Sequence, residues 1–173
     1  MKPPVLVVAG PTASGKTSLG IALAKEYNGE VVSADSMQVY KGLDIATAKP
    51  TKEEVQAVPH YLVDFLDRDV SFSVADYVKL AYQKIDEIHS RGKLPIVVGG
   101  TGLYISSMMD NIQYTEISSD ESIRQKYYNM AEEFGKAYLL QRLDEVDHQT
   151  AITLHENNLG RVVRALEVYE LTG

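Results

Sequence analysis

The hydrophobic pattern of the chain changes character along its length. Up to about residue 112, short apolar runs of strand length alternate with stretches in which apolar residues recur at helical spacing. The expected strands cover residues 5–9, 30–33, 59–64 and 94–98. The expected helices cover residues 16–27, 52–57 and 74–91, with Ser73 as the N-cap of the last one. Strands that alternate with helices predict an α/β fold with a mainly parallel sheet flanked by helices.

The strand pattern stops near Asn111, and the remaining chain has helical periodicity only. Helices are expected at residues 121–134, 136–143, 148–154 and 158–171. We therefore expect two regions, an α/β core at residues 1–112 and a helical region at residues 113–173.

A glycine-rich loop stands between the first expected strand and the first expected helix. Residues Gly10–Thr17 read GPTASGKT and fill every fixed position of the phosphate-binding pattern G-x-x-x-x-G-K-T. Its glycines let several backbone N–H groups point at one anion, and the helix that follows adds its positive dipole end. The ammonium group of Lys16 supplies a full charge, and the hydroxyl of Thr17 can hold Mg²⁺. This strand–loop–helix unit predicts a P-loop NTPase-like fold and the binding of a phosphate-bearing ligand. The predicted ligand-binding residues are Gly10, Pro11, Thr12, Ala13, Ser14, Gly15, Lys16 and Thr17.

Two further unusual loops, residues 33–38 and 99–104, also follow expected strands. In parallel sheets ligands bind beyond the carboxyl ends of the strands, so all three loops should meet at one edge. Asp35 at the end of the second strand is a candidate for a functional role. It could hold a metal, act as a general base or hydrogen-bond acceptor for a second substrate, or be an ordinary loop aspartate.

The end of the fourth expected strand lacks a feature of most P-loop enzymes. Typical P-loop ATPases and GTPases carry an acidic residue near the end of an internal strand to hold Mg²⁺, whereas this strand runs into Gly99 and Gly100. The difference argues against a motor protein or a switch GTPase. Gly99, Gly100 and Gly102 suggest a close backbone approach to a ligand, with the hydroxyl of Thr101 in the site, or else a tight turn.

Composition and charge exclude several classes of protein. The 173 residues carry a net charge of −7, which argues against a general nucleic-acid coat but allows a local basic groove. The absence of cysteine excludes disulfides, thiol catalysis and cysteine metal sites, and the four histidines show no metal-binding spacing. No apolar run reaches the ~20 residues of a membrane span. We expect a cytoplasmic protein with no membrane association.

Several stretches, in order and over nearly the whole chain, resemble the tRNA dimethylallyltransferase family, also called isopentenyl-pyrophosphate:tRNA transferases. Two of them, DSMQ at residues 35–38 and GGTGLY at residues 99–104, are far more specific than the phosphate loop. The full set is Gly10–Thr17, Asp35–Tyr40, Gly42–Ile45, Thr47–Lys49, Pro59–His60, Ser73–Asp76, Gly99–Tyr104 and Arg164–Glu167.

The resemblance implies transfer of a dimethylallyl group from its diphosphate to the exocyclic amine of the adenine 3′ of the tRNA anticodon. The phosphate loop would then hold the donor rather than serve ATP hydrolysis, with Ser14, Lys16 and Thr17 binding diphosphate and Mg²⁺. The partners implied are dimethylallyl diphosphate and the anticodon loop of tRNA, and a monomer is expected.

The resemblance also implies the roles of the acceptor-side residues. Asp35 would accept a proton from the adenine amine or orient it, and Thr101 would contact the tRNA. Ser36, Met37 and Gln38 would line the pocket for an unstacked base. Arg161 and Arg164 lie in a stretch that matches a tRNA-contacting segment of the family.

Departures and alternatives accompany this interpretation. His148, Glu156 and Ala46 stand where the family usually has proline, proline and glycine. Family members continue past Gly173, so a chain of this length is expected to bind phosphate ligands but to transfer little prenyl group. The alternative enzyme is a small P-loop kinase or adenylate prenyltransferase that acts on a free nucleotide. The alternative without catalysis is a nucleotide- or RNA-binding module.

Overall fold

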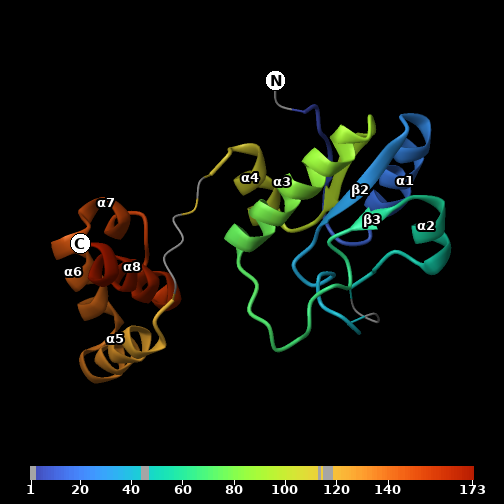
Figure 1. The fold of residues 1–173 in the computed structure, drawn as a ribbon. Helices are drawn as coiled ribbons and strands as arrows, with labels where there is room; N and C mark the ends of the chain where they lie inside the picture. Colours follow the sequence, from blue (N-terminus) through green and yellow to red (C-terminus); the bar gives the residue numbers. More distant parts are fainter. Residues whose placement is uncertain (1–2, 44–46, 113, 115–118) are drawn as a thin grey trace. The chain divides into compact units, whose positions relative to one another are not determined.

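The computed structural model describes residues 3–43, 47–112, 114 and 119–173. It divides into two compact units, Met1–Tyr114 and Thr115–Gly173 (Figure 1). The expected motif residues Asp44 and Ile45, the departure at Ala46 and the boundary residue Gln113 lie outside the described residues. Each unit has its own hydrophobic core, and each is described by itself.

The first unit is built on a four-stranded sheet whose paired strands are all parallel, in the order β1-β4-β2-β3. The strands are β1 (Leu6–Ala9), β2 (Gly29–Ala34), β3 (His60–Tyr61) and β4 (Leu94–Gly99). Ile96 of β4 stands opposite Leu6 on one side and Val31 on the other. The inner strands β2 and β4 are buried along almost their whole length, as expected for a parallel sheet covered on both faces. The predicted α/β, P-loop NTPase-like fold class is confirmed.

Helices cover the two faces of this sheet (Figure 1). On one face α1 (Lys16–Glu26) packs its Ile21 and Ala24 against Val31 and Val98. On the other face α3 (Val74–Ser90) and α4 (Gly102–Met109) pack against Val32 and Val97. Neighbouring residues of one strand thus enter different cores, because side chains alternate across a strand.

Two helix starts predicted from the sequence have complete capping boxes. The Ser73 hydroxyl accepts from the Asp76 backbone N–H, and the Asp76 carboxylate accepts from the Ser73 backbone N–H. Thr51 and Glu54 form the same reciprocal pair at the start of α2 (Lys52–Ala57). Each box satisfies backbone donors that a helix leaves without intrahelical partners.

The third predicted strand was too long. Residues 59–64 were expected to be extended, but β3 contains only His60 and Tyr61. Leu62 and Asp64 have positive φ angles of 58° and 56°, which a strand cannot accommodate. Parallel pairing resumes only at the isolated bridge between Tyr40 and Leu66.

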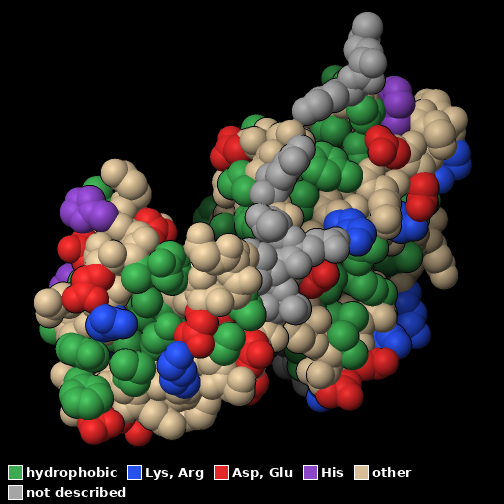
Figure 2. All heavy atoms as spheres, turned by 60° about the vertical axis from the view of Figure 1, so that its left-hand side comes forward, with side chains coloured by type: hydrophobic (Ala, Val, Ile, Leu, Met, Phe, Trp, Pro, Cys, Tyr) green, Lys and Arg blue, Asp and Glu red, His purple; other side chains and the backbone are tan. Residues whose placement is uncertain are grey.

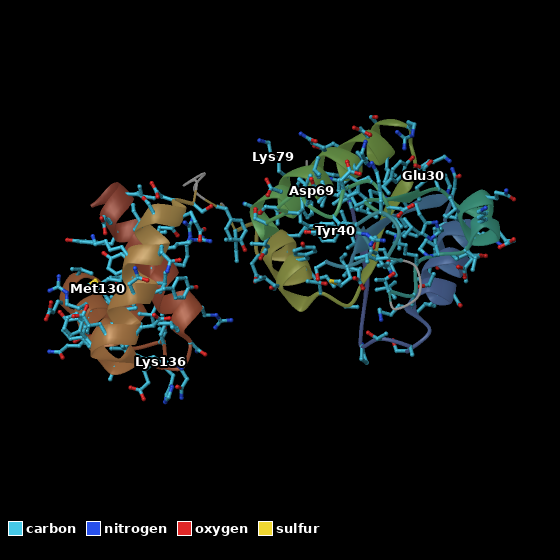
Figure 3. The ribbon with its side chains drawn as sticks, turned by 90° about the horizontal axis from the view of Figure 1, so that it is seen from below. Glu30, Tyr40, Asp69, Lys79, Met130 and Lys136 are labelled. Carbon is cyan, nitrogen blue, oxygen red and sulfur yellow. The ribbon has the colours of Figure 1, made fainter. Side chains whose placement is uncertain are left out.

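A buried carboxylate ties together the amino-terminal end of β2 in the first unit. The side chain of Glu30, 4% exposed, accepts from Arg91 over 2.6 Å, from Lys93 over 2.8 Å and from the Tyr61 hydroxyl over 2.8 Å. Figure 3 shows Glu30 away from Tyr40, which follows the other end of β2. This cluster is therefore structural and lies away from the loops that end the strands.

In the second unit, the regular elements of the described residues 119–173 are all helices. They are α5 (Glu121–Phe134), α6 (Lys136–Val146), α7 (His148–Ala151) and α8 (Leu159–Thr172). Leu139 and Leu143 of α6 pack against Val162, Val163 and Leu166 of α8. The helix expected at residues 148–154 ends earlier, because the N–H groups of Thr153 and Leu154 bond three residues back, which tightens the chain out of α geometry.

Glu167 is a buried charge of this unit. Its side chain is fully buried, and it accepts from Arg124 over 3.0 Å, from Arg164 over 2.7 Å and from the backbone N–H of Asp120 over 2.6 Å. Burial by itself raises the pKa of Glu167. The three donors lower the pKa by more than burial raises it, so the net pKa lies below its usual value. Glu167 thereby joins the beginning of α5 to α8.

Across the residues that the structure describes, no helix combines the length and apolar character that a membrane crossing requires.

Candidate active site

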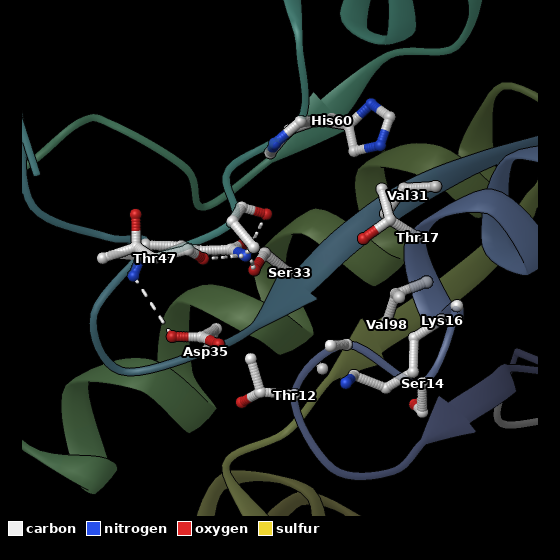
Figure 4. Close-up of a pocket in the computed structure, with 16 residues that line it drawn as sticks. Thr12, Ser14, Lys16, Thr17, Val31, Ser33, Asp35, Thr47, His60 and Val98 are labelled. Atoms are coloured by element: carbon white, nitrogen blue, oxygen red, sulfur yellow. Dashed lines mark hydrogen bonds between the residues drawn. The ribbon is translucent and has the colours of Figure 1, made fainter. Parts of the chain in front are cut away.

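A cavity of about 230 Å³ opens at the carboxyl ends of the strands, beside the phosphate loop (Figure 4). Its lining comes from the phosphate loop, from β2 with the loop that follows, from residues 47–50, and from single residues of β3 and β4. The lining residues are Thr12, Ala13, Ser14, Gly15, Lys16, Thr17, Val31, Ser33, Asp35, Gln38, Thr47, Ala48, Pro50, His60, Val98 and Gly99. All three predicted loops therefore contribute to one cavity: residues of 10–17 and 33–38, and Gly99 of 99–104.

The phosphate loop has the backbone of an anion cradle. Ala13 and Gly15 have positive φ angles of 63° and 82°, and α1 starts directly after them at Lys16. The first turn of α1 contains no acidic residue, so nothing in the helix neutralises its positive end. The Lys16 ammonium group donates to the carbonyl oxygen of Pro11. This hydrogen bond holds the positive charge of Lys16 at the phosphate loop. The loop thus presents backbone N–H groups, a helix start and a cation to one anion.

Gly99, Gly100 and Gly102, at and after the end of β4, have different surroundings. A Cβ at Gly99 would lie 2.1 Å from the carbonyl oxygen of Ala34, so this glycine permits the close approach of β2 to β4. The neighbouring strand by itself requires glycine here, and the expected close approach of a ligand to Gly99 stays a prediction. A Cβ at Gly100 would instead lie 3.3 Å from the Gly10 carbonyl oxygen and 3.9 Å from the Lys16 nitrogen, so Gly100 faces the phosphate loop. Gly102 has open space around it.

Asp35 uses one carboxylate oxygen to shape its own loop. Its Oδ1 accepts from the backbone N–H groups of Met37 over 2.9 Å and of Gln38 over 3.2 Å. Such an aspartate turn fixes the side-chain direction. Among the described residues, none donates a hydrogen bond to Oδ2 of Asp35. One oxygen therefore positions the carboxylate, and the other is available at the cavity.

Ser36 and Thr101 connect the second and third loops. The Ser36 backbone N–H donates to Oγ1 of Thr101 over 2.9 Å, and the Thr101 hydroxyl lies 3.3 Å from Oγ of Ser36. Neither residue is part of the cavity lining, and nor is Met37, whose side chain is 51% exposed. The predicted tRNA contacts of Ser36, Met37 and Thr101 stay predictions.

Both the oxygen and the nitrogen of the Gln38 side chain form hydrogen bonds within the protein. Its Oε1 accepts from the Ser33 hydroxyl over 3.0 Å. Its Nε2 donates to the carbonyl oxygens of Thr47 over 2.9 Å and Ala48 over 3.1 Å. The amide therefore connects β2 to residues 47–48.

His60 lines the cavity next to Thr17 and Val31 (Figure 4). Its Nδ1 lies 2.7 Å from the Val58 carbonyl oxygen, which can only accept, so the proton belongs on Nδ1. Burial lowers the pKa of His60 below its usual 6.5, and the ring is neutral at pH 7. The sequence assigned no function to His60, Thr47, Ala48 or Pro50. The stretches Pro59–His60 and Thr47–Lys49 were part of the family resemblance, and this was the available signal.

Arg161 and Arg164 belong to the second unit. Arg161 is exposed on α8, and Arg164 donates to buried Glu167 over 2.7 Å. Figure 2 shows acidic and basic side chains interspersed on the visible face. The predicted contacts of the two arginines with tRNA stay predictions.

Comparisons with known proteins agree with these motifs. A family model described as IPP transferase matches residues 38–173. The tRNA dimethylallyltransferase of Thermoanaerobacter sp. (strain X514) is 50% identical over 169 residues, which are 98% of this chain and 54% of that protein. The protein of the same name from Exiguobacterium sp. is 53% identical over 167 residues, 96% of this chain and 54% of that protein. The chain thus spans about half the length of the curated relatives it matches.

Two solved structures are similar over nearly the whole chain. The full-length tRNA isopentenylpyrophosphate transferase of Bacillus halodurans is 46% identical with a TM-score of 0.65, and the match covers 100% of this chain and 57% of that one. A eukaryotic dimethylallyltransferase described as acting on tRNA is 34% identical with a TM-score of 0.77, and the match covers 95% of this chain and 41% of that one.

The family match extends over most of the chain, and relatives about half identical in sequence cover nearly all of it. The resemblance inferred from the motifs is confirmed, and the chain belongs to the IPP transferase family.

Proposed function

We propose that this chain carries the donor-binding and catalytic part of an enzyme that prenylates tRNA. The group transferred is dimethylallyl, from dimethylallyl diphosphate to the exocyclic amine of the adenine 3′ of the anticodon. The observation that carries this proposal is that Lys16, Thr17 and Asp35 line one cavity. A phosphate cradle and a fixed carboxylate are what such a transfer needs side by side. The names of the curated relatives support the same reaction.

The donor's diphosphate lies on the phosphate loop in this proposal. The bond between the allylic carbon and the diphosphate oxygen breaks, and diphosphate leaves with the electron pair. Negative charge therefore grows on the leaving group, where Lys16, the backbone N–H groups and the start of α1 stabilise it. Ser14 and Thr17 add hydroxyl groups at the same cradle.

Mg²⁺ fits this donor set. It prefers oxygen ligands and is commonly held by one or two protein groups together with substrate phosphates. Among the described residues, no cluster of three or more His, Cys, Asp or Glu side chains could hold a metal by itself. Thr17 would therefore hold the ion together with the diphosphate oxygens, where it would neutralise part of the leaving-group charge.

The acceptor amine meets Asp35. The adenine nitrogen forms the new bond to the allylic carbon, and its proton passes to Oδ2 of Asp35. Oδ1 keeps the carboxylate in place through the N–H groups of Met37 and Gln38. A positioned base of this kind contributes to the rate because it is already oriented when the proton is released.

The remaining acceptor contacts belong to the same proposal. Ser36, Met37 and Thr101 face the unstacked base, and Arg161 and Arg164 meet the tRNA backbone, as the family resemblance implies. The monomeric state and the cytoplasmic location expected from the sequence are also part of it.

Calorimetric titration tests the donor side directly. Dimethylallyl diphosphate should bind the chain more tightly than ATP does, and Lys16→Ala should weaken its binding at least about tenfold, because a full charge leaves the anion site. Lys25→Ala, at the exposed end of α1, is the matched control and should bind the donor like the wild type. Equal donor affinities of Lys16→Ala and wild type, or a clear preference for ATP, would contradict the proposal.

A further inference from the structure

Residues 47–50 form a wall of the cavity on the side away from the phosphate loop. Figure 4 shows Thr47 and Lys16 on opposite sides of the cavity. Thr47, Ala48 and Pro50 of this segment line it. We propose that Gln38 is a positioning residue of the donor pocket, which holds this wall and thereby sets the room for the prenyl chain. The inference rests on the proposed function and gives Gln38 a role other than the base contact expected from the family resemblance.

The hydrogen bonds of Gln38 leave it little capacity for a substrate. A carboxamide has two N–H donors, and both lie at carbonyl oxygens of the wall, those of Thr47 and Ala48. Its oxygen already accepts from the Ser33 hydroxyl. To pair with an adenine edge, Gln38 would have to release the wall. The side chain is therefore a brace between β2 and the wall.

The fixed end of this brace is rigid. Ser33 lies in β2, the strand between β3 and β4, and is only 3% exposed. Its hydroxyl holds the Gln38 oxygen from within the sheet. The Gln38 backbone N–H also donates to Asp35, so the brace starts from the same loop as the carboxylate. Gln38 thus fixes the position of the wall relative to the sheet and to Asp35.

The wall itself is held in a conformation that needs support. Ala48 has a φ of 45°, in the left-handed region that non-glycine residues rarely adopt. Both carbonyl oxygens that Gln38 holds belong to this turn, at Thr47 and Ala48. A second attachment follows at Lys49, which is 9% exposed and bonds to the Tyr40 carbonyl oxygen and to Asp64. Surrounding contacts of this kind are what keep a strained backbone in one conformation.

The cavity is divided chemically between its two sides. The phosphate loop offers charge and N–H groups, whereas Ala48 and Pro50 of the wall offer apolar surface. A prenyl diphosphate has the same division, with an anionic head and a short hydrocarbon tail. With the head on the loop, the tail extends toward the wall. Moving the wall would therefore change tail binding and leave head binding largely unchanged.

The test compares ligands that differ only in the tail. Binding of inorganic diphosphate, dimethylallyl diphosphate and the ten-carbon geranyl diphosphate is measured by calorimetry on wild type, Gln38→Ala and Ser33→Ala. We expect Gln38→Ala to bind dimethylallyl diphosphate about tenfold more weakly, with inorganic diphosphate affinity within about twofold. Its discrimination between dimethylallyl and geranyl diphosphate should shrink by a similar factor. Gln83→Ala, an exposed glutamine of α3, is the matched control and should bind all three ligands like the wild type.

Ser33→Ala provides an independent variant, because it removes the fixed end of the brace without touching the loop. It should weaken donor binding, as Gln38→Ala does. The loss of donor-binding free energy in the double variant should be smaller than the sum of the losses in the two single variants. Thermal unfolding of each variant shows whether the fold is retained. A global defect would also weaken the binding of inorganic diphosphate, whereas a displaced wall would not.

Binding of an anticodon stem-loop RNA gives the opposing outcome. If Gln38→Ala weakens RNA binding tenfold and leaves all three diphosphates unchanged, Gln38 is a base contact and the inference is overturned. Equal binding of dimethylallyl diphosphate and inorganic diphosphate by the wild type would instead contradict the proposed function, whatever the variants do.

Discussion

The backbone N–H of Ser36 donates to the side-chain oxygen of Thr101, 65 residues further along the chain, over 2.9 Å. Ser36 follows β2 and Thr101 follows β4, and these strands are neighbours in the sheet. The Thr101 side chain therefore fixes the start of the loop that carries Asp35. Its hydroxyl is a structural element of the site, whatever contact with tRNA it also makes.

Thr101→Val should destabilise the protein, because it keeps the side-chain shape and leaves the Ser36 N–H without its acceptor. A half-buried donor without a partner costs about 1–3 kcal/mol, so the free energy of unfolding should fall by about that amount in chemical denaturation. Thr101→Ser keeps the hydroxyl and should lose less. If the valine variant is as stable as the wild type, the bond contributes nothing to the loop.

Asp35→Asn should lower the transfer rate about 10²–10⁴-fold and leave donor affinity within about twofold. The amide keeps an oxygen that can accept from Met37 and Gln38, so the loop should retain its shape. It cannot take up the proton of the adenine amine. Single-turnover rates and donor titrations across a Mg²⁺ series check the prediction. A parallel loss of donor affinity that added Mg²⁺ restores would instead make Asp35 a metal ligand.

Tyr77 and Tyr82 should respond in opposite directions to replacement by phenylalanine. The Tyr77 hydroxyl is buried and finds no hydrogen-bond partner among the described residues, whereas that of Tyr82 donates to the Met108 carbonyl oxygen over 2.6 Å. Tyr77→Phe removes a buried polar group and keeps the ring stacked on Tyr104. The free energy of unfolding should therefore rise by about 1 kcal/mol. Tyr82→Phe should lower stability by a similar amount. Denaturation midpoints measure both, and a marked loss in Tyr77→Phe would reveal an unrecognised partner.

Acid should destabilise the protein through Glu30 and Glu167, the two glutamates that are buried among the described residues. For both carboxyls burial alone raises the pKa, but the donors around Glu30 and Glu167 lower it below the usual 4.5 overall. The unfolded chain therefore binds these protons first as pH falls, and the stabilisation present above pH 4.5 is lost below it. The free energy of unfolding, measured from pH 7 to pH 3, should decline below about pH 4.5. Glu167→Gln should make this decline shallower at the cost of lower stability at pH 7, and a variant with an unchanged pH profile would contradict the assignment.

Local pattern predicted most of the elements of the fold. The spacing of Leu19, Leu23 and Tyr27 indicated α1, and Ser73 with Asp76 indicated the start of α3, because helix periodicity and capping are properties of short stretches. The early end of β3 was not predictable in this way. It depends on the positive φ angles at Leu62 and Asp64, for which leucine is no signal and aspartate only a weak one.

The sequence predicted which loops form the candidate site, but it did not predict the hydrogen bonds that join them. The parallel sheet brings the phosphate loop and Asp35 together, as strand ends should. The bonds from Gln38 to Thr47 and from Ser36 to Thr101 join residues that no local pattern relates. Motifs in the sequence identified candidates for chemistry. The structure adds which side chains hold the site together, and it shows that Oδ2 of Asp35 receives no hydrogen bond from the described residues.

Transfer of label from dimethylallyl diphosphate tests the central claim most directly. The donor, labelled in its prenyl group, is incubated with tRNA or with AMP and with the chain extended after Gly173 by the remainder of the Thermoanaerobacter relative, 54% of which the chain matches. The account predicts label on tRNA, at the adenine 3′ of the anticodon, none on AMP, and loss of transfer in Asp35→Asn. Label on AMP with none on tRNA would contradict it and make the protein an enzyme of free nucleotides.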